Sequence, residues 1–169
     1  MNKNIILTVV GPDKPGIVSN ISEIVKNCSG NIDKSRMVRL GDFFTIMVLV
    51  SIDENYLKQL ENEINKDSNY KITIHESNND LKESDEDIHI IHLNGMDNEG
   101  LVYEITNELA KLSINIEELE TNITNAPMSG LTLFSLIAKI SHPKLDRKIL
   151  NEKMNSLAAE LDVNIILKD

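Results

Sequence analysis

The chain has 169 residues, enough for one domain or two small ones. Its 27 acidic residues outnumber 17 basic ones, and the net charge of -10 argues against direct binding to a nucleic-acid backbone. The single cysteine, Cys28, excludes an intramolecular disulfide. No apolar run approaches membrane-spanning length, so we expect a soluble, cytoplasmic protein that does not bind a membrane.

The first half predicts six elements in chain order. Alternating and helical spacings of apolar residues indicate a strand at 4–10, a helix at 15–28, strands at 31–40 and 43–52, a helix at 56–64 and a strand at 70–76. The two middle strands are joined by Gly41 and Asp42, which is typical of a hairpin. We expect Asp13 to cap the first helix and Gly30 to end it.

The second half repeats the order β-α-β-β-α-β. Strands are predicted at 87–93, 114–124, 130–140 and 163–168, with helices at 101–112 and 145–161. The acidic, polar stretch between the halves predicts a solvated linker. The expected domains are therefore 1–77 and 87–169, joined by a linker at 78–86.

A shift of 84 residues aligns the two halves. It places five residues of the first half on identical residues of the second, and these pairs are Gly11 and Gly95, Asp13 and Asp97, Gly16 and Gly100, Asn31 and Asn115, and Ile32 and Ile116. Amphipathic periodicity alone would not align glycine, acid and asparagine together. The chain therefore contains an internal repeat.

The repeated unit predicts an α+β fold of two tandem ferredoxin-like domains, each an antiparallel four-stranded sheet with helices on one face. The first strand should lie beside the third, and the loop GPDKPG should open at the start of the first helix. Unpaired N–H groups there favour a small anion. Gly11 and Gly16 would allow close backbone approach, although glycine and proline also punctuate such turns without a ligand.

Asn31 and Asn115 stand at the start of the second strand of each unit. A carboxamide can both donate and accept hydrogen bonds, which suits an amino acid. We expect the preceding helix to return the chain toward the loop, so that each asparagine faces it. The alternative is a turn-forming asparagine after a helix.

The pattern strand–GxDxPG–helix–NI–strand resembles the ACT domain, and the tandem pair resembles the glycine cleavage system transcriptional repressor family. The stretches GPDKPGIVSNIS, CSGNIDKSRMVRLGDFFTIMVLVS and NIEELETNIT carry this resemblance. It implies a small amino acid as ligand, glycine above all, bound where the loop of one unit meets a neighbouring unit. It also implies that two ACT units pair within the chain or across a homodimer, and that transcription is controlled through a protein partner such as a DNA-binding regulator.

The resemblance assigns ligand-facing positions in both units. They are Gly11, Asp13, Pro15, Gly16, Ile17, Val18, Asn31 and Ile32 in the first, and Gly95, Asp97, Gly100, Leu101, Val102 and Asn115 in the second. Glu99 replaces the proline in the second unit and would compete with an anionic ligand, which favours the first site. Two alternatives remain: a regulatory subunit that docks on a metabolic enzyme, and a scaffold whose ligand site is vestigial.

We expect neither catalysis nor a cofactor or metal. His89 and His92 should lie on opposite faces of a strand, and Cys28 should be a buried, inert thiol. Met37, Met47 and Met154 fall within apolar patterns and should fill the cores.

Overall fold

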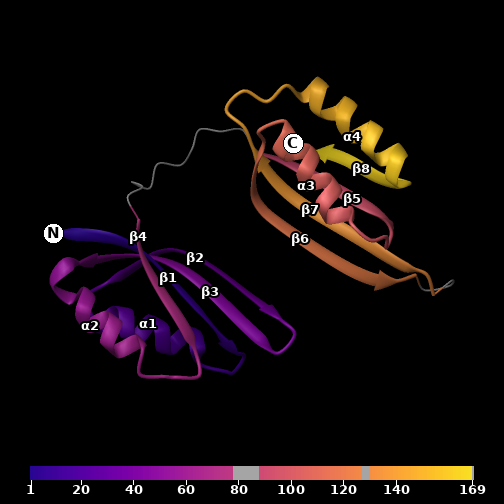
Figure 1. The fold of residues 1–169 in the computed structure, drawn as a ribbon. Helices are drawn as coiled ribbons and strands as arrows, with labels where there is room; N and C mark the ends of the chain where they lie inside the picture. Colours follow the sequence, from indigo (N-terminus) through magenta and orange to yellow (C-terminus); the bar gives the residue numbers. More distant parts are fainter. Residues whose placement is uncertain (78–87, 127–129, 169) are drawn as a thin grey trace. The chain divides into compact units, whose positions relative to one another are not determined.

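The computed structural model describes residues 1–77, 88–126 and 130–168. The chain divides into two compact units, Met1–Lys82 and Glu83–Asp169, and each has its own hydrophobic core. Figure 1 shows both units. The predicted linker at 78–86 lies outside the described residues.

The first unit contains the six predicted elements. They are β1 (Asn2–Pro12), α1 (Ile17–Asn27), β2 (Asn31–Leu40), β3 (Phe43–Asp53), α2 (Glu54–Ile64) and β4 (Lys71–Ser77). The antiparallel sheet has the order β2-β3-β1-β4, which confirms that the first strand lies beside the third. Both helices cover one face of this sheet (Figure 1).

The second unit has the same topology. Its elements are β5 (Ile88–Met96), α3 (Leu101–Lys111), β6 (Asn115–Asn125), β7 (Thr132–Ser141), α4 (Arg147–Leu161) and β8 (Val163–Lys168). The sheet order is β6-β7-β5-β8, so the predicted pair of ferredoxin-like folds is confirmed. A register shift lies between Ile32 and Lys34 in β2 and between Ile116 and Glu118 in β6, at the same place in each unit. None of the described helices is long and apolar enough to cross a membrane.

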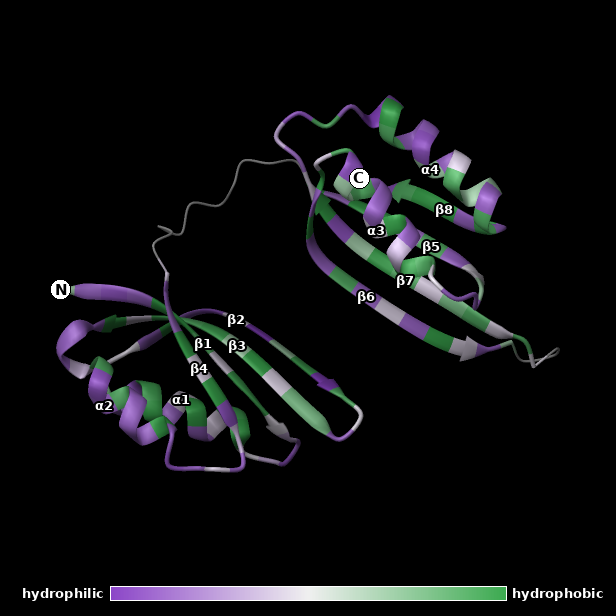
Figure 2. Cartoon of the chain, in the orientation of Figure 1, coloured by the Kyte–Doolittle hydropathy of each residue, from purple (hydrophilic) through white to green (hydrophobic). Residues whose placement is uncertain are grey.

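Alternation along the strands separates the core from the outer face of each sheet. In β1, Ile5, Leu7 and Val9 point to the helices and are buried. In α1, Ile17 and Ile21 are among the residues that form the matching buried stripe. Burying each such side chain contributes about 1.5–3 kcal/mol. Figure 2 shows that β3 is hydrophobic along most of its length, whereas α2 alternates polar and apolar residues.

The ends of α1 differ from the predicted ones. Its N-cap is Gly16 rather than Asp13, and no side chain caps the first turn. At the other end, Ser29 has φ 55°, so the left-handed residue is Ser29 and not Gly30. The Gly30 N–H donates to the Val25 carbonyl (2.9 Å), while the Ser29 N–H donates to that of Lys26 (3.0 Å). These two bonds form a Schellman motif, which ends the helix without requiring glycine.

The methionine prediction is right for one residue and wrong for two. Met154 is buried at 2% exposure, but Met37 and Met47 are 47% and 48% exposed. Met47 lies between the buried Ile46 and Val48 in β3, and therefore points to the face of the sheet opposite the helices. An apolar run in sequence does not reveal which of its residues face the core.

Candidate functional site

The loops between the first strand and helix of each unit share a backbone conformation. The N-caps Gly16 and Gly100 have φ 93° and 87°, in the left-handed region where other residues are strained. A Cβ at either position would meet nothing within 4 Å, so the need for glycine is conformational and not steric. Because no side chain caps either helix, the first-turn N–H groups remain available to an anion.

Gly11 and Gly95 have a different explanation from the one that the sequence suggested. A Cβ on Gly11 would lie 2.4 Å from Cδ1 of Tyr70 and 2.9 Å from the carbonyl oxygen of Asn69. A Cβ on Gly95 would lie 2.5 Å from Cγ1 of Val163. At both glycines, residues of the same unit occupy the space that a side chain would need. The requirement for glycine at these positions is therefore not evidence that a ligand approaches the backbone there.

Asp13 and Asp97 join each loop to the adjacent hairpin. The N–H of Asp13 donates to the carbonyl of Asp42 (2.9 Å), and that of Asp97 donates to Thr132 (3.0 Å). The Asp13 carboxylate also lies 3.3 Å from the guanidinium of Arg39. Since this ion pair is largely exposed, it contributes at most about 1 kcal/mol and mainly orients the loop.

The expectation that Asn31 faces the loop is wrong. Asn31 is opposite Ser51 on β3, which is in turn opposite Asn4 near the start of β1. Gly11 lies at the other end of β1, about 23 Å away at 3.3 Å per residue. The helix α1 runs antiparallel to β1 and therefore carries the chain away from the loop. Within one unit, the loop and the asparagine cannot contact the same small ligand.

A polar cluster surrounds each asparagine instead. The amide of Asn31 donates to the Asp33 carboxylate (2.7 Å), which also accepts from the Ser51 hydroxyl (3.4 Å). The second unit repeats the arrangement, since Glu117 accepts hydrogen bonds from the side chains of Asn115 and Ser141. The repeated asparagine thus has an intramolecular role that its position in sequence did not reveal.

The apolar positions assigned by resemblance differ in exposure. Ile17 and Leu101 are buried in the cores, so only their backbone could meet a ligand at the surface of the loop. The side chains of Val18 and Val102 are 37% and 39% exposed. Pro15 and Glu99 are exposed and Ile32 is half-buried.

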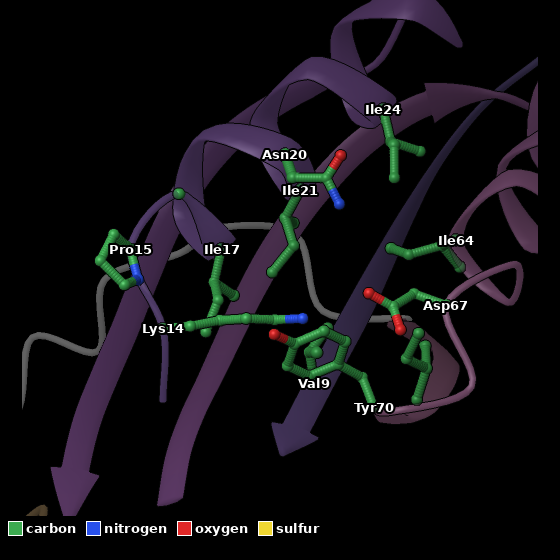
Figure 3. Close-up of a pocket in the computed structure, with 12 residues that line it drawn as sticks. Val9, Lys14, Pro15, Ile17, Asn20, Ile21, Ile24, Ile64, Asp67 and Tyr70 are labelled. Carbon is green, nitrogen blue, oxygen red and sulfur yellow. The ribbon is translucent and has the colours of Figure 1, made fainter. Parts of the chain in front are cut away.

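The first unit contains a cavity of about 290 Å³ that the sequence did not indicate. It lies beside the start of α1, between this helix and the segment that joins α2 to β4 (Figure 3). Aliphatic side chains form most of its wall, and these belong to Val9, Ile17, Ile21, Ile24, Ile64 and Ile72. They come from four separate elements, so a short sequence motif could not have predicted the cavity.

Polar groups of opposite charge gather at one side of this cavity. The Lys14 ammonium lies 5.3 Å from the centroid of the Tyr70 ring. The Tyr70 hydroxyl is buried and has no hydrogen-bond partner among the described residues. One oxygen of Asp67 accepts hydrogen bonds from the N–H (3.0 Å) and the side-chain amide (2.6 Å) of Asn69. These bonds, and more weakly the Lys14 charge, lower the pKa of Asp67.

The second unit has a different groove between its helices. That groove, of about 300 Å³, is lined mainly by charged side chains, including Glu104, Glu108 and Lys111. Glu104 and Glu108 stand 84 positions after Asn20 and Ile24, which line the cavity of the first unit. Lys111 already pairs with Glu108. The two units therefore share a fold but offer different surroundings to a ligand.

The structure places the histidines and the cysteine that the sequence analysis considered. His89 is buried and His92 points to the other face of β5, as expected. In residues 1–77, 88–126 and 130–168, no three His, Cys, Asp or Glu side chains are placed to hold a metal ion. Cys28 is fully buried, and burial raises the pKa of its thiol.

The first unit matches the family model of the ACT domain over residues 3–75. The chain is also 38% identical over 73 residues to a UPF0237 protein of Streptococcus pneumoniae serotype 4, a match that spans 83% of that protein and 41% of this chain. The chain belongs to the ACT-domain family. The second ACT unit is recognised by its identical topology and its internal repeat.

Other relatives have the tandem arrangement or a regulatory name. A crystal structure of an unknown protein from Galdieria sulphuraria is 30% identical, with a TM-score of 0.86, and the match covers 99% of this chain and 98% of that one. A structure assigned as a glycine cleavage system transcriptional repressor has a TM-score of 0.71 and matches 100% and 99% of the two chains at 19% identity, which shows the fold alone.

A curated sequence carries the same repressor name. The glycine cleavage system transcriptional repressor of Escherichia coli K12 is 39% identical over 57 residues. This match covers 34% of this chain and only 30% of the repressor's own length. The chain is thus related to a regulatory ACT protein, while the repressor's activity and partners do not follow from the match.

Proposed function

We propose that this ACT protein senses a small amino acid and regulates transcription through a protein partner. The observation that carries the proposal is the tandem pair of ACT units in a chain that is similar to part of a transcriptional repressor of the glycine cleavage system. Glycine is the amino acid that this similarity suggests. A ligand would act by stabilising one arrangement of the chain over another.

The loops at Gly16 and Gly100 are the proposed points of contact for the ligand carboxylate. Their glycine N-caps and uncapped helix starts support this role. Because Asn31 lies at the far end of its own sheet, it can complete such a site only if another ACT unit supplies it. We therefore propose that a second copy of the chain, in a homodimer, provides the asparagine.

Thermal unfolding in the presence of free amino acids tests this function, with glycine first. A ligand at 100 times its Kd stabilises the folded protein by about 2.7 kcal/mol, which raises the Tm by several degrees. Asn31→Ala should abolish the shift. Dilution of the wild-type protein to monomer should abolish it as well, because the asparagine comes from the second copy of the chain. If no amino acid raises the Tm, sensing is refuted and a protein-docking scaffold becomes the better explanation.

Action through a partner is proposed because of the net charge of -10. Such a chain should not bind duplex DNA measurably by fluorescence anisotropy at about 0.15 M salt, where nonspecific binding depends on neutralised phosphates. Salt-dependent binding of the protein alone to random duplexes would overturn this part of the proposal. Capture of an amino-acid-pathway enzyme in place of a DNA-binding regulator would favour the docking-subunit alternative.

A further inference from the structure

The cavity of the first unit is complete within that unit, unlike the site that requires a second ACT unit. Its wall comes from β1, α1, α2 and β4, and its polar side from the two loops that adjoin them. Figure 3 shows the labelled side chains around a common space, with the Lys14 side chain extending toward Tyr70. At about 290 Å³ it is near the lower end of the range of roughly 300–1,000 Å³ for small-molecule sites.

The polar side of the cavity offers partners for both an anion and a cation. Lys14 forms no ion pair with any residue that the structure describes, and its ammonium is available to a carboxylate. The buried hydroxyl of Tyr70 is a second donor without a partner. Asp67 uses one carboxylate oxygen for Asn69, which leaves the other to accept from an ammonium group.

A buried hydroxyl without a partner is costly to the folded protein, because it loses its hydrogen bonds to water. A ligand that accepts from Tyr70 would remove this cost. Tyr70 is also the residue whose ring occupies the space above Gly11. The absence of a side chain at Gly11 therefore leaves room for the Tyr70 ring, which lines the cavity.

The rest of the cavity wall is aliphatic and therefore favours amino acids with an apolar side chain. Val9, Ile21 and Ile64 are buried core residues that border the cavity, and Ile24 and Ile72 are half-buried beside them. Glycine has no side chain to pack against this aliphatic wall. Each methylene that a ligand buries contributes roughly a fourfold gain in affinity.

We propose that this cavity binds one α-amino acid with an aliphatic side chain, held by Lys14, Tyr70 and Asp67 at its charged end. The inference rests on the proposed sensing function for the class of ligand, but it places the ligand inside the first unit. Among its described residues, the second unit does not repeat this charged end, because Asn98 replaces Lys14, and Glu104 and Glu108 replace Asn20 and Ile24. The expected stoichiometry is one ligand per chain.

Calorimetric titration of the full chain with leucine, glycine and 4-methyl-2-oxopentanoate tests the inference. Leucine should bind on the order of 100-fold more tightly than glycine because its side chain adds buried methylenes. The oxo acid has the same carbon skeleton without the ammonium group, and should bind roughly tenfold more weakly than leucine. In Asp67→Asn, which keeps the acceptor for Asn69, this preference for leucine over the oxo acid should disappear.

Two further variants and one control separate binding from folding. Lys14→Gln and Tyr70→Phe should each weaken leucine binding roughly 10- to 100-fold, because each removes a hydrogen-bond donor to the charged end of the ligand. Tyr70→Phe should leave the unliganded protein at least as stable, because only the unpartnered hydroxyl is lost. Asn98→Gln, the matched change in the second unit, should leave leucine binding unchanged.

The outcomes distinguish this inference from the proposed function. Tight glycine binding that Lys14→Gln and Tyr70→Phe leave unaltered would refute the cavity while sensing at the loops would stand. Leucine binding that is equally weakened by Asn98→Gln, or two leucines per chain, would also refute it. Binding of no amino acid would overturn both proposals.

Discussion

The packing of Tyr70 over Gly11 gives a prediction that can be worked through from the structure. In Gly11→Ala, the new Cβ would lie 2.4 Å from Cδ1 of Tyr70 and 2.9 Å from the backbone carbonyl of Asn69. Both distances are too short, and the carbonyl can move only with the chain around it. Overpacking of this kind costs about 1–3 kcal/mol. Gly11 has no positive φ, so backbone strain does not add to the cost.

An opposing effect must be subtracted from that figure. Alanine restricts the unfolded chain more than glycine does, which stabilises the folded state by about 0.4–1 kcal/mol where the conformation is compatible. The steric cost exceeds this gain, and we expect a net loss of about 1–2 kcal/mol in the free energy of unfolding of the first unit. The size of the loss depends on how far Tyr70 and Asn69 shift to accommodate the new methyl group.

The assay must report on the first unit alone, because unfolding of a chain with two units is not two-state. The protein has no tryptophan and three tyrosines, of which only Tyr103 belongs to the second unit. Tyr103 is 63% exposed, so Tyr103→Phe should be tolerated. In that background, tyrosine fluorescence during urea unfolding follows Tyr56 and Tyr70. The midpoint for Gly11→Ala should fall with little change in slope.

A double-mutant cycle provides the control. If the ring of Tyr70 causes the loss, Gly11→Ala should cost less in a Tyr70→Ala background than in the wild type, with a coupling energy of about 0.5 kcal/mol or more. An unchanged midpoint for Gly11→Ala would show that the contact is not restrictive. Additive effects of the two substitutions would show that Tyr70 is not the residue that excludes a side chain at Gly11.

Three further predictions concern a helix cap, a carboxylate and a thiol. Asp146 accepts hydrogen bonds from the N–H groups of Lys148 (3.0 Å) and Ile149 (3.1 Å), so Asp146→Ala should destabilise the second unit by about 1 kcal/mol in urea, whereas Asp146→Asn should retain most of the cap. The pKa of Asp67 is lowered by its bonds to Asn69, so its stabilising effect is present above the ordinary pKa of an aspartate and is lost as the pH falls through the lowered value. An NMR titration should place this pKa below 3.8, and a value at or above 3.8 would contradict the hydrogen-bonded geometry. The thiol of Cys28 is buried with a raised pKa, so a thiol reagent near pH 8 should modify it only when the first unit unfolds, and rapid modification of the native protein would contradict its burial.

Much of the fold could be predicted from local patterns. Periodicity located all the described strands and helices, and the repeat at 84 residues indicated two equivalent units. The glycine at position 16 was also identifiable, because a strand followed by a helix needs a turn that few other residues can make. These features depend on residues that are close in sequence.

The structure corrected the predictions where the decisive neighbour is distant in sequence. The ring of Tyr70 excludes a side chain at position 11. Asp13 does not cap α1 but is hydrogen-bonded to Asp42 and paired with Arg39. Asn31 was expected to face the loop, but α1 carries the chain to the far end of the sheet. Each of these contacts depends on how the strands are paired, and a local sequence pattern does not predict that pairing.

The sequence by itself therefore determined the elements, their order, the repeat and the ACT family. The tertiary structure alone decided which side chains share a space, and it revealed the cavity beside Lys14, Asp67 and Tyr70. The physical reason is that secondary structure follows from the spacing of apolar residues along one segment. A cavity is formed by segments that meet only after folding, and its walls are ordinary core residues until that happens.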